Sequence, residues 1–163
     1  MALSWRKARL DDAALLWRWA NDAETRRNAF DPAPIPYADH VGWLERRLAS
    51  AATRLLVFSD EAGPVGQVRF DVSDGVAEID VAIAPERRGQ GLGTAMLRQA
   101  LAGLRAEGGE ALRPRAHVLT HNERSLRMFR RCGFREVGTD ERDGARALVL
   151  EPAAAAKDSG DRG

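Results

Sequence analysis

Residues 81–97 read Val81-Ala82-Ile83-Ala84-Pro85-Glu86-Arg87-Arg88-Gly89-Gln90-Gly91-Leu92-Gly93-Thr94-Ala95-Met96-Leu97. This segment predicts an apolar strand, a proline that ends it, a basic glycine-rich turn and the start of an amphipathic helix. Glycines at alternate positions let the backbone approach a ligand closely, and the first turn of a helix carries amide N–H groups without internal partners. Such a turn binds anions, and Arg87 and Arg88 add positive charge, so we expect a phosphate or pyrophosphate ligand here.

The chain has 163 residues, a length that suits one domain with a sizeable core. Hydrophobic residues make up 44% and charged residues 30%, both near the average for globular proteins. The 25 Lys and Arg residues nearly balance the 24 Asp and Glu residues, so the overall charge gives no argument for a nucleic-acid partner. We expect a single domain over residues 1–151 and a disordered tail over residues 152–163, which are mostly alanine, small and charged residues.

The single cysteine, Cys132, cannot form an internal disulfide, which suits a reducing compartment. No stretch of 18 consecutive apolar residues occurs, and the N-terminus lacks a long apolar run behind a basic start. We therefore expect a cytoplasmic protein that does not contact a membrane.

Hydrophobic periodicity and turn residues predict alternating strands and helices along the chain. The predicted strands cover residues 3–8, 54–58, 65–72, 76–84, 115–120, 134–139 and 145–151. Four helices are predicted, which begin after Asp11 or Asp12, after Pro36, at Leu92 and near Ser125. The order is β-α-α-β-β-β-α-β-α-β-β. It indicates a mixed α/β fold with about seven strands in a central, mostly antiparallel sheet.

The glycine turn has other interpretations. A dinucleotide-binding fold places Gly-x-Gly-x-x-Gly in a βαβ unit, whereas this turn follows the third strand of a meander and reads Gly-x-Gly-x-Gly. A Walker A loop needs a lysine before its Ser or Thr, and here Gly93 precedes Thr94. The remaining alternative is a tight turn with a purely structural role.

A second segment lies about thirty residues further on and reads Asn122-Glu123-Arg124-Ser125-Leu126-Arg127-Met128-Phe129-Arg130-Arg131-Cys132-Gly133-Phe134. Together with Arg88-Gly89-Gln90-Gly91-Leu92-Gly93, it resembles the two signatures of the GNAT superfamily of acetyl-CoA-dependent N-acetyltransferases. The first signature reads Arg/Gln-x-x-Gly-x-Gly/Ala. The second reads Asn-x-x-Ser/Ala, followed by an aromatic residue and Gly-Phe. The resemblance covers nearly the whole chain except its tail and implies the GNAT fold.

The resemblance implies acetyl-CoA as co-substrate. The amides of the turn would hold its pyrophosphate, and a gap between the strands that end near Ile83 and Thr120 would hold its pantetheine arm. The resemblance also implies a bulge near Val81 or Ala82 that presents a backbone N–H to the reacting carbonyl. The expected cofactor-binding residues are Val81, Ala82, Ile83, Arg88, Gly89, Gln90, Gly91, Leu92, Gly93, Thr94, Asn122, Ser125 and Phe129.

Three of these residues have structural alternatives. Asn122 and Ser125 are typical helix-capping residues, and Phe129 suits a core position. Phe129 is also a departure from the family, many members of which carry a tyrosine that protonates the leaving sulfur. Because phenylalanine cannot donate a proton, either water takes that role or the domain binds coenzyme A without catalysis.

Two carboxylates lie on the strand before the glycine turn. Alternation places the apolar residues of this strand on one face and Glu78 and Asp80 on the other. A central strand covered by helices is apolar on both faces, so these carboxylates predict a wet cleft. An amine with a pKa near ~10.4 must lose a proton before it attacks a thioester. The GNAT resemblance implies that Glu78 is the general base, because members often carry a glutamate on this strand, and Asp80 is the second candidate. The alternative is a solvated face or a pair with an arginine.

The three histidines, His40, His117 and His121, do not have metal-ligand spacing, so no metal is expected. Each suits a surface or packing position, and His121, next to Asn122, is the one with a candidate acceptor-side role. Cys132 has no histidine partner placed by the sequence and is expected to be buried and not nucleophilic.

The acceptor is expected to bind the first two helices and their loop. Residues 17–22, 26–27, 35 and 40–44 resemble the opening of GNAT members that acetylate amino sugars on nucleotide carriers, and also that of ribosomal-protein-alanine acetyltransferases. Aromatic residues with arginines can stack on a sugar and pair with phosphates, or they can form a core stripe with a solvated basic edge. We expect a small amine acceptor, first a nucleotide-linked amino sugar. The alternatives are a protein N-terminus, an aminoglycoside, or a catalytically silent coenzyme A-binding module. A homodimer is compatible with this interpretation.

Overall fold

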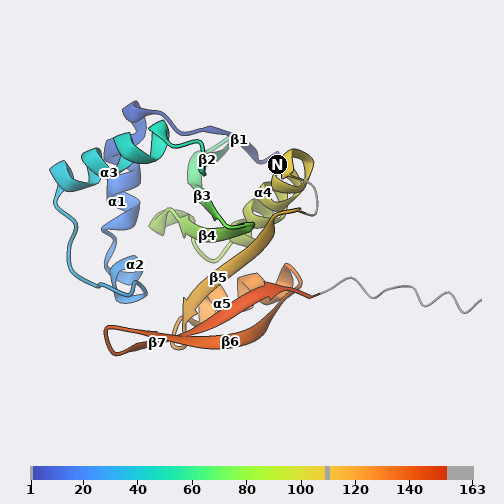
Figure 1. Ribbon diagram of the computed structural model, residues 1–163. Coiled ribbons are helices and arrows are strands. Elements are labelled where there is room, and N and C mark those ends of the chain that lie inside the picture. Colours follow the sequence, from blue (N-terminus) through green and yellow to red (C-terminus); the bar gives the residue numbers. More distant parts are fainter. Residues whose placement is uncertain (1, 109–110, 154–163) are drawn as a thin grey trace, which may run out of the picture.

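The computed structural model describes residues 2–108 and 111–153 (Figure 1). Seven strands are present in this part of the chain: β1 Ser4–Lys7, β2 Thr53–Asp60, β3 Gly63–Ser73, β4 Val76–Ile83, β5 Arg113–Leu119, β6 Phe134–Arg142 and β7 Ala145–Pro152. The same part holds five α-helices: α1 Ala13–Ala20, α2 Ala23–Arg27, α3 Tyr37–Ala49, α4 Leu92–Gly108 and α5 Glu123–Arg131. Short 3-10 turns cover Leu10–Asp12 and Pro85–Arg87.

The predicted order of elements and the mixed α/β class are confirmed, with two differences. The short helix α2 was not predicted, so the count of four helices is wrong by one. Pro152, expected to begin a disordered tail, is the last residue of β7, and the Ala153 N–H donates to the Gly133 carbonyl at 2.8 Å. The rest of the predicted tail lies outside the described residues.

The seven strands form one sheet in the order β1-β2-β3-β4-β5-β7-β6. Every neighbouring pair is antiparallel except β4 and β5, which are parallel. Their pairing runs only from Val76↔Arg113 to Glu78↔Arg115. Beyond that point the two strands separate, as Figure 1 shows, and the gap expected between them is present.

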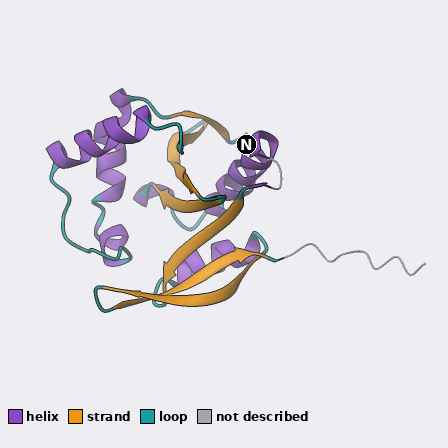
Figure 2. Cartoon of the chain, viewed as in Figure 1, coloured by secondary structure: helices purple, strands orange, loops and turns teal. Residues whose placement is uncertain are grey.

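Helices pack on both faces of the sheet (Figure 2). One face carries α4 and α5, whose apolar residues pack on Phe58, Val68 and Phe70. The opposite face carries α1 and α3, where Trp19 and Leu44 pack on alternate residues of β2. Because side chains alternate along β2, this one strand contributes residues to the cores on both faces of the sheet.

Two hairpin turns were predicted from Asp-Gly pairs and are confirmed. Asp74-Gly75 joins β3 to β4 and Asp143-Gly144 joins β6 to β7, with positive φ at all four residues. This conformation defines the type I′ turn, whose twist matches that of the flanking strands.

The bulge expected near Val81 or Ala82 is not where the sequence placed it. The register between β3 and β4 runs without a shift from Gly66↔Ile83 to Ser73↔Val76. Register shifts lie elsewhere in the sheet, at Phe58/Ser59 between β2 and β3 and at Glu136/Gly138 between β6 and β7. Separately, no helix in the described part of the chain has both the length and the apolar character needed to cross a membrane.

Candidate active site

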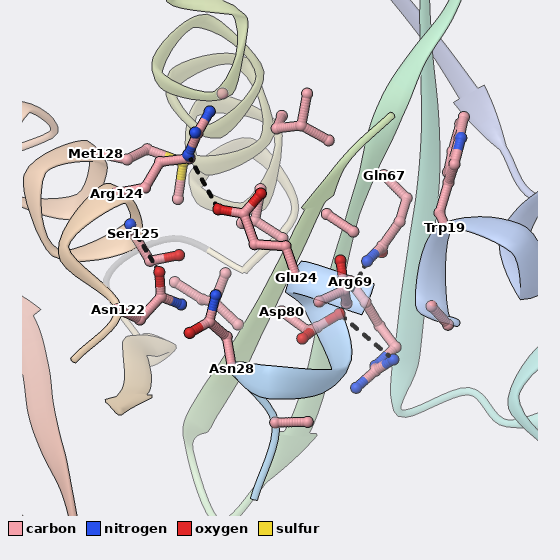
Figure 3. A pocket seen from close by; sticks show the side chains of 18 of the residues that line it. Trp19, Glu24, Asn28, Gln67, Arg69, Asp80, Asn122, Arg124, Ser125 and Met128 are labelled. Carbon is pink, nitrogen blue, oxygen red and sulfur yellow. Dashed lines mark hydrogen bonds and ion pairs between the residues drawn. The ribbon is translucent and has the colours of Figure 1, made fainter. Parts of the chain in front are cut away.

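A cavity of about 830 Å³ opens where β4 and β5 separate, a size typical of small-molecule sites. Its walls come from α1 to α3 on one side and from the glycine turn and α5 on the other. Figure 3 shows the side chains that converge on it, among them Glu24 and Asn28 from one side and Asn122 and Ser125 from the other.

The glycine turn forms one end of this cavity. Gly89 and Gly91 have φ angles of 78° and 72°, a region that favours glycine, and α4 begins at Leu92. A Cβ at Gly93 would lie 2.8 Å from the Met128 sulfur, so glycine lets α4 and α5 pack closely. The predicted residues that line the cavity here are Arg88, Gly89, Gly91, Leu92, Gly93 and Thr94. Gln90 is exposed and is not among the described lining residues.

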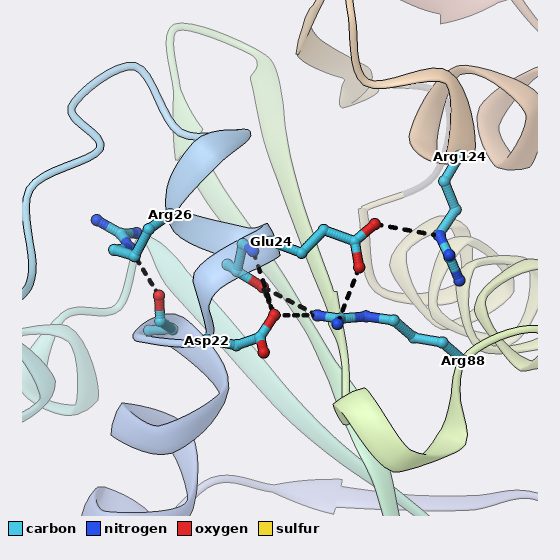
Figure 4. Close-up of polar contacts among 7 residues, drawn as sticks. Asp22, Glu24, Arg26, Arg88 and Arg124 are labelled. Atoms are coloured by element: carbon cyan, nitrogen blue, oxygen red, sulfur yellow. Dashed lines mark hydrogen bonds and ion pairs between the residues drawn. The ribbon is translucent and has the colours of Figure 1, made fainter.

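The two arginines that were expected to add positive charge at the turn are both paired with carboxylates. Arg87 donates to Asp60, with one hydrogen bond of 3.0 Å. Arg88 donates to Asp22 at 2.6 Å and lies 2.9 Å from Glu24 (Figure 4). Burial acts to raise the pKa of Asp22, but the hydrogen bonds from Arg88 and from the Thr25 amide lower it below the usual value.

Helix α2 therefore bridges the acceptor-side helices and the glycine turn. Asp22 caps α2 by accepting from the Thr25 N–H, and Glu24 sits between Arg88 and Arg124 of α5, 3.5 Å from the latter (Figure 4). No apolar residue of α2 is buried, so these contacts hold it in place. The contacts with Arg88 and Arg124 join residues far apart in sequence.

Backbone polar groups on β4 face the gap. The Ala84 N–H donates to the Val65 carbonyl of β3 at 2.8 Å. Backbone groups alternate along a strand, so those of Ala82 also face β3, whereas those of Val81 and Ile83 face β5. Val81, Ala82 and Ile83 all line the cavity. Only the first and third present hydrogen-bonding groups to the gap.

Helix α5 supplies the opposite wall. The Asn122 side chain accepts the Ser125 N–H at 3.3 Å, so Asn122 is the N-cap of α5 as well as a lining residue. Phe129 is 3% exposed and packs edge-to-face on Phe134 with ring centres 5.1 Å apart. It lines the cavity as part of the core, and it has no proton to donate.

The two candidate bases occupy different surroundings. Asp80 lines the cavity, where its carboxylate accepts a hydrogen bond from Gln67 at 2.8 Å and lies 3.8 Å from Arg69. Glu78 is bonded to His117 of β5 and is not among the described lining residues. Asp80, the second candidate in the sequence, is thus the carboxylate that faces the cavity.

Sequence reasoning missed the position of His117. Its ring lies between Glu78 and Asp140 and lines the cavity. No local signal marks it, because its partners are on β4 and β6. His121 instead approaches the Arg27 carbonyl at 3.2 Å and is exposed. Burial raises the pKa of the Cys132 thiol, which does not suit a nucleophile.

The acceptor end of the cavity combines opposite charges with an aromatic ring. Arg69 of β3 stacks on Trp43 at 4.9 Å and lies beside Asp80. His40 is 5% exposed, and burial, with a smaller effect of Arg69, lowers its pKa, so its ring is neutral at pH 7. Trp19 is a core residue, and Trp17 donates its indole N–H to the Ile35 carbonyl at 2.7 Å. In the part of the chain that the structure describes, no three His, Cys, Asp or Glu side chains are placed so that they could hold a metal ion together.

Comparison with known proteins gives four matches of use here. A family model described as "Acetyltransferase (GNAT) domain" matches residues 3–135. An L-methionine sulfoximine/L-methionine sulfone acetyltransferase from Pseudomonas aeruginosa is 30% identical over 142 residues, which span 82% of this chain and 81% of that protein. A spermidine N-acetyltransferase from Vibrio cholerae, solved with CoA and spermine, has a TM-score of 0.77 at 20% identity and covers 91% of this chain and 94% of its own. An aminoglycoside acetyltransferase solved with ribostamycin and coenzyme A has a TM-score of 0.80 at 22% identity. The match covers 99% of this chain and 100% of that one.

Proposed function

Because the chain belongs to the GNAT acetyltransferases, we propose that it transfers the acetyl group of acetyl-CoA to the primary amine of a small acceptor. The observation that carries this proposal is the gap between β4 and β5. It exposes the backbone groups of Val81 and Ile83 to a cavity that ends at the glycine turn. A strand without a partner can pair with an extended chain that contains amides, such as a pantetheine arm.

The features of the cavity suit acetyl-CoA, which supplies an acetyl group activated as a thioester. The positive φ angles of Gly89 and Gly91 and the N-terminus of the 17-residue helix α4 support a phosphate site at the turn. We assign the pantetheine contacts to Val81 and Ile83, with Asn122 and Ser125 on the facing wall. Phe129 would pack beside the thioester, and protonation of the departing thiolate falls to water.

For the acceptor we propose an α-amino acid or a close analogue. In such a molecule the amine and the carboxylate are neighbours, and Asp80 and Arg69 offer complementary charges 3.8 Å apart in the same cavity. The relative from Pseudomonas is named for two amino-acid analogues, which supports this class. The nucleotide-linked amino sugar that the sequence favoured is the second candidate. Its support is weaker because Trp17 and Trp19 are occupied in the fold.

The test is thiol release from acetyl-CoA in the presence of an amine panel. The panel holds L-methionine sulfone, L-methionine sulfoximine, spermidine, ribostamycin, a nucleotide-linked amino sugar and a peptide with an N-terminal alanine. We expect the amino-acid analogues to give the largest kcat/KM. A larger value for any other member would overturn the acceptor class. If no amine raises release above background while coenzyme A binds, the chain is a silent coenzyme A-binding module and the transferase proposal fails.

A further inference from the structure

A histidine joins the two parts of the sheet where they begin to separate. His117 of β5 has its Nδ1 hydrogen-bonded to Glu78 of β4, and its Nε2 lies 3.5 Å from a carboxylate oxygen of Asp140 on β6. Its side chain is 13% exposed and lines the cavity. Three titratable groups from three strands thus stand in a row at the inner end of the gap.

The strand register relates this row to the acceptor. Glu78 is paired with Arg115 in the last pair before the strands separate. When this parallel register is extended by two residues on each strand, Asp80 lies opposite His117 across the gap. Both residues line the cavity. An ammonium group held by Asp80 would therefore face the imidazole.

We propose that His117 removes the proton from the acceptor amine, with Glu78 as a positioning residue and Asp140 as the counter-charge. This inference rests on the proposed transferase function. An ionised carboxylate can only accept a hydrogen bond, so Glu78 holds the ring proton on Nδ1 and leaves a lone pair on Nε2, the nitrogen 3.5 Å from Asp140. A base oriented by a third group in this way is the usual arrangement in acyl transfer.

The proton balance of the step is as follows. An N–H bond of the ammonium breaks and an N–H bond forms at Nε2 of His117. The neutral amine then forms its bond to the acetyl carbon as the carbon–sulfur bond breaks. The nitrogen loses its second proton as the amide forms, and the thiolate takes up that proton through water. The proton on Nε2 leaves past Asp140, whose side chain is 34% exposed, to solvent.

The charges around the ring suit a transient imidazolium. Glu78 and Asp80 face it from β4 and Asp140 from β6. The nearest arginines are already paired: Arg142 donates to Asp140 at 3.0 Å, and Arg115 donates to Glu151 of β7 at 3.3 Å. Helix α2 adds Glu24 and Arg26 to the wall of the same cavity.

The arrangement of the ring can be tested without any acceptor. Nitrogen NMR of labelled histidine should place the proton of neutral His117 on Nδ1 in the wild-type protein. In Glu78→Ala the Nε2–H form should grow, because nothing then holds the proton on Nδ1. A wild-type ring that carries its proton on Nε2 would overturn the proposal, even if the chain proves to be an active acetyltransferase.

The kinetic test uses the best acceptor of the panel. His117→Gln should lower kcat/KM by about 10²–10⁴-fold, the range for loss of a general base, and should make the rate rise with pH where the wild type is level. Coenzyme A affinity should stay unchanged. Glu78→Gln, which keeps a hydrogen-bond acceptor, should retain more activity than Glu78→Ala. His121→Gln is the matched control because His121 lies outside the cavity lining.

Wild-type kcat/KM and pH dependence in a folded His117→Gln variant would overturn the proposal while leaving the transferase function in place. Absence of thiol release in the wild type would instead sink the transferase function, and the NMR result would then decide the His117–Glu78 arrangement alone.

Discussion

Arg69 is the cation that lies closest to the proposed amine site, and it has a structural counterpart outside the cavity. Both Arg69 and Arg47 stack on Trp43 and bind Asp71, but only Arg69 lines the cavity. Replacing Arg69 and Arg47 in turn therefore distinguishes a role in packing from a role in binding the carboxylate of the acceptor.

Arg69→Leu should raise KM for an amino-acid acceptor by roughly 10–100-fold, since a charge-assisted hydrogen bond contributes about 1.5–3 kcal/mol. Arg47→Leu removes the same stacking and ion-pair contacts and should leave KM within about threefold of wild type. Steady-state kinetics with L-methionine sulfone measure both. Equal KM changes in the two variants would show that Arg69 acts through packing alone.

Asp12 is a second residue with a specific expected role, in this case in the pH dependence of stability. Arg6 donates to both of its carboxylate oxygens at 2.7 and 2.8 Å, and the Arg9 N–H donates at 2.7 Å. The bonds from Arg6 lower the pKa of Asp12, burial opposes them, and the Arg9 amide adds to the lowering. A carboxyl with a lowered pKa stabilises the folded state while it is ionised.

Asp12→Asn should reduce the free energy of unfolding at pH 7 by about 1.5 kcal/mol, the low end for charged hydrogen bonds, because Arg6 is partly exposed. The loss should be complete above pH ~4, the ordinary aspartate pKa, and should shrink as the pH falls through the lower pKa of the folded state. Urea unfolding across this range measures it, with the exposed Asp11→Asn as control. A difference that stays constant down to pH ~2 would contradict the assignment.

At the scale of the elements, Gly66 allows β3 and β4 to lie close together because it has no side chain. A Cβ at this position would lie 2.3 Å from the Ala82 carbonyl oxygen and 2.9 Å from the Met96 side chain. Because the first of these atoms is backbone, β4 itself would have to move, and with it the groups of Val81 and Ile83.

Gly66→Ala should therefore destabilise the protein by about 1–3 kcal/mol and weaken coenzyme A binding together. Thermal unfolding and calorimetric titration give the two values. Gly103→Ala is the control. Gly103 lies in the interior of α4, and a Cβ there would have no atom within 4 Å, so this change should stabilise the protein by about 0.5–1 kcal/mol. Unaltered coenzyme A affinity in Gly66→Ala would show that β4 does not carry the pantetheine contacts.

Helix α2 offers a different test at this scale, because Glu24 neutralises Arg88 and Arg124 at the phosphate end of the cavity. Glu24→Gln should tighten coenzyme A binding several-fold, since Arg124 then loses its carboxylate partner and Arg88 keeps only Asp22, which leaves both arginines with donors for phosphate oxygens. The salt dependence of the dissociation constant should become steeper. Glu136→Gln on the exposed side of β6 makes the same charge change away from the site. Weaker binding in Glu24→Gln would mean that α2 holds the turn in its binding form.

These elements also show which features local sequence can predict. The turns at Asp74-Gly75 and Asp143-Gly144 follow from residues that tolerate positive φ, and the strands between them follow from alternation. Such signals lie within a few residues of one another. The opening between β4 and β5 was instead predicted from the family resemblance.

The features that were missed depend on partners far apart in the chain. Helix α2 has no buried apolar residue and is held by Arg88, 66 residues after Asp22. His117 meets Glu78 across 39 residues, on a strand with ordinary apolar neighbours. No periodicity marks either contact, since each exists only once the sheet has formed.

For the molecule as a whole, the gap divides the sheet unequally. Strands β1 to β4 stand on one side and β5 to β7 on the other, and the described β4–β5 ladder joins them through three residue pairs. The Glu78–His117 hydrogen bond and the core under α4 and α5, with residues such as Leu97, Ala116 and Leu150, also connect the two sides.

Because of this division, we expect the sheet to open as two cooperative units whose coupling depends on the donor. Without coenzyme A, the amides of Val81 and Ile83 have no strand partner and should exchange with deuterium within seconds, and β5 to β7 should exchange at a rate of their own. Saturating coenzyme A should protect both amides and bring the two units to a common exchange rate, because its arm would stand where a strand is missing. The bound donor would then take the place of a strand in the sheet, and slower hydrogen exchange across all seven strands would report its binding.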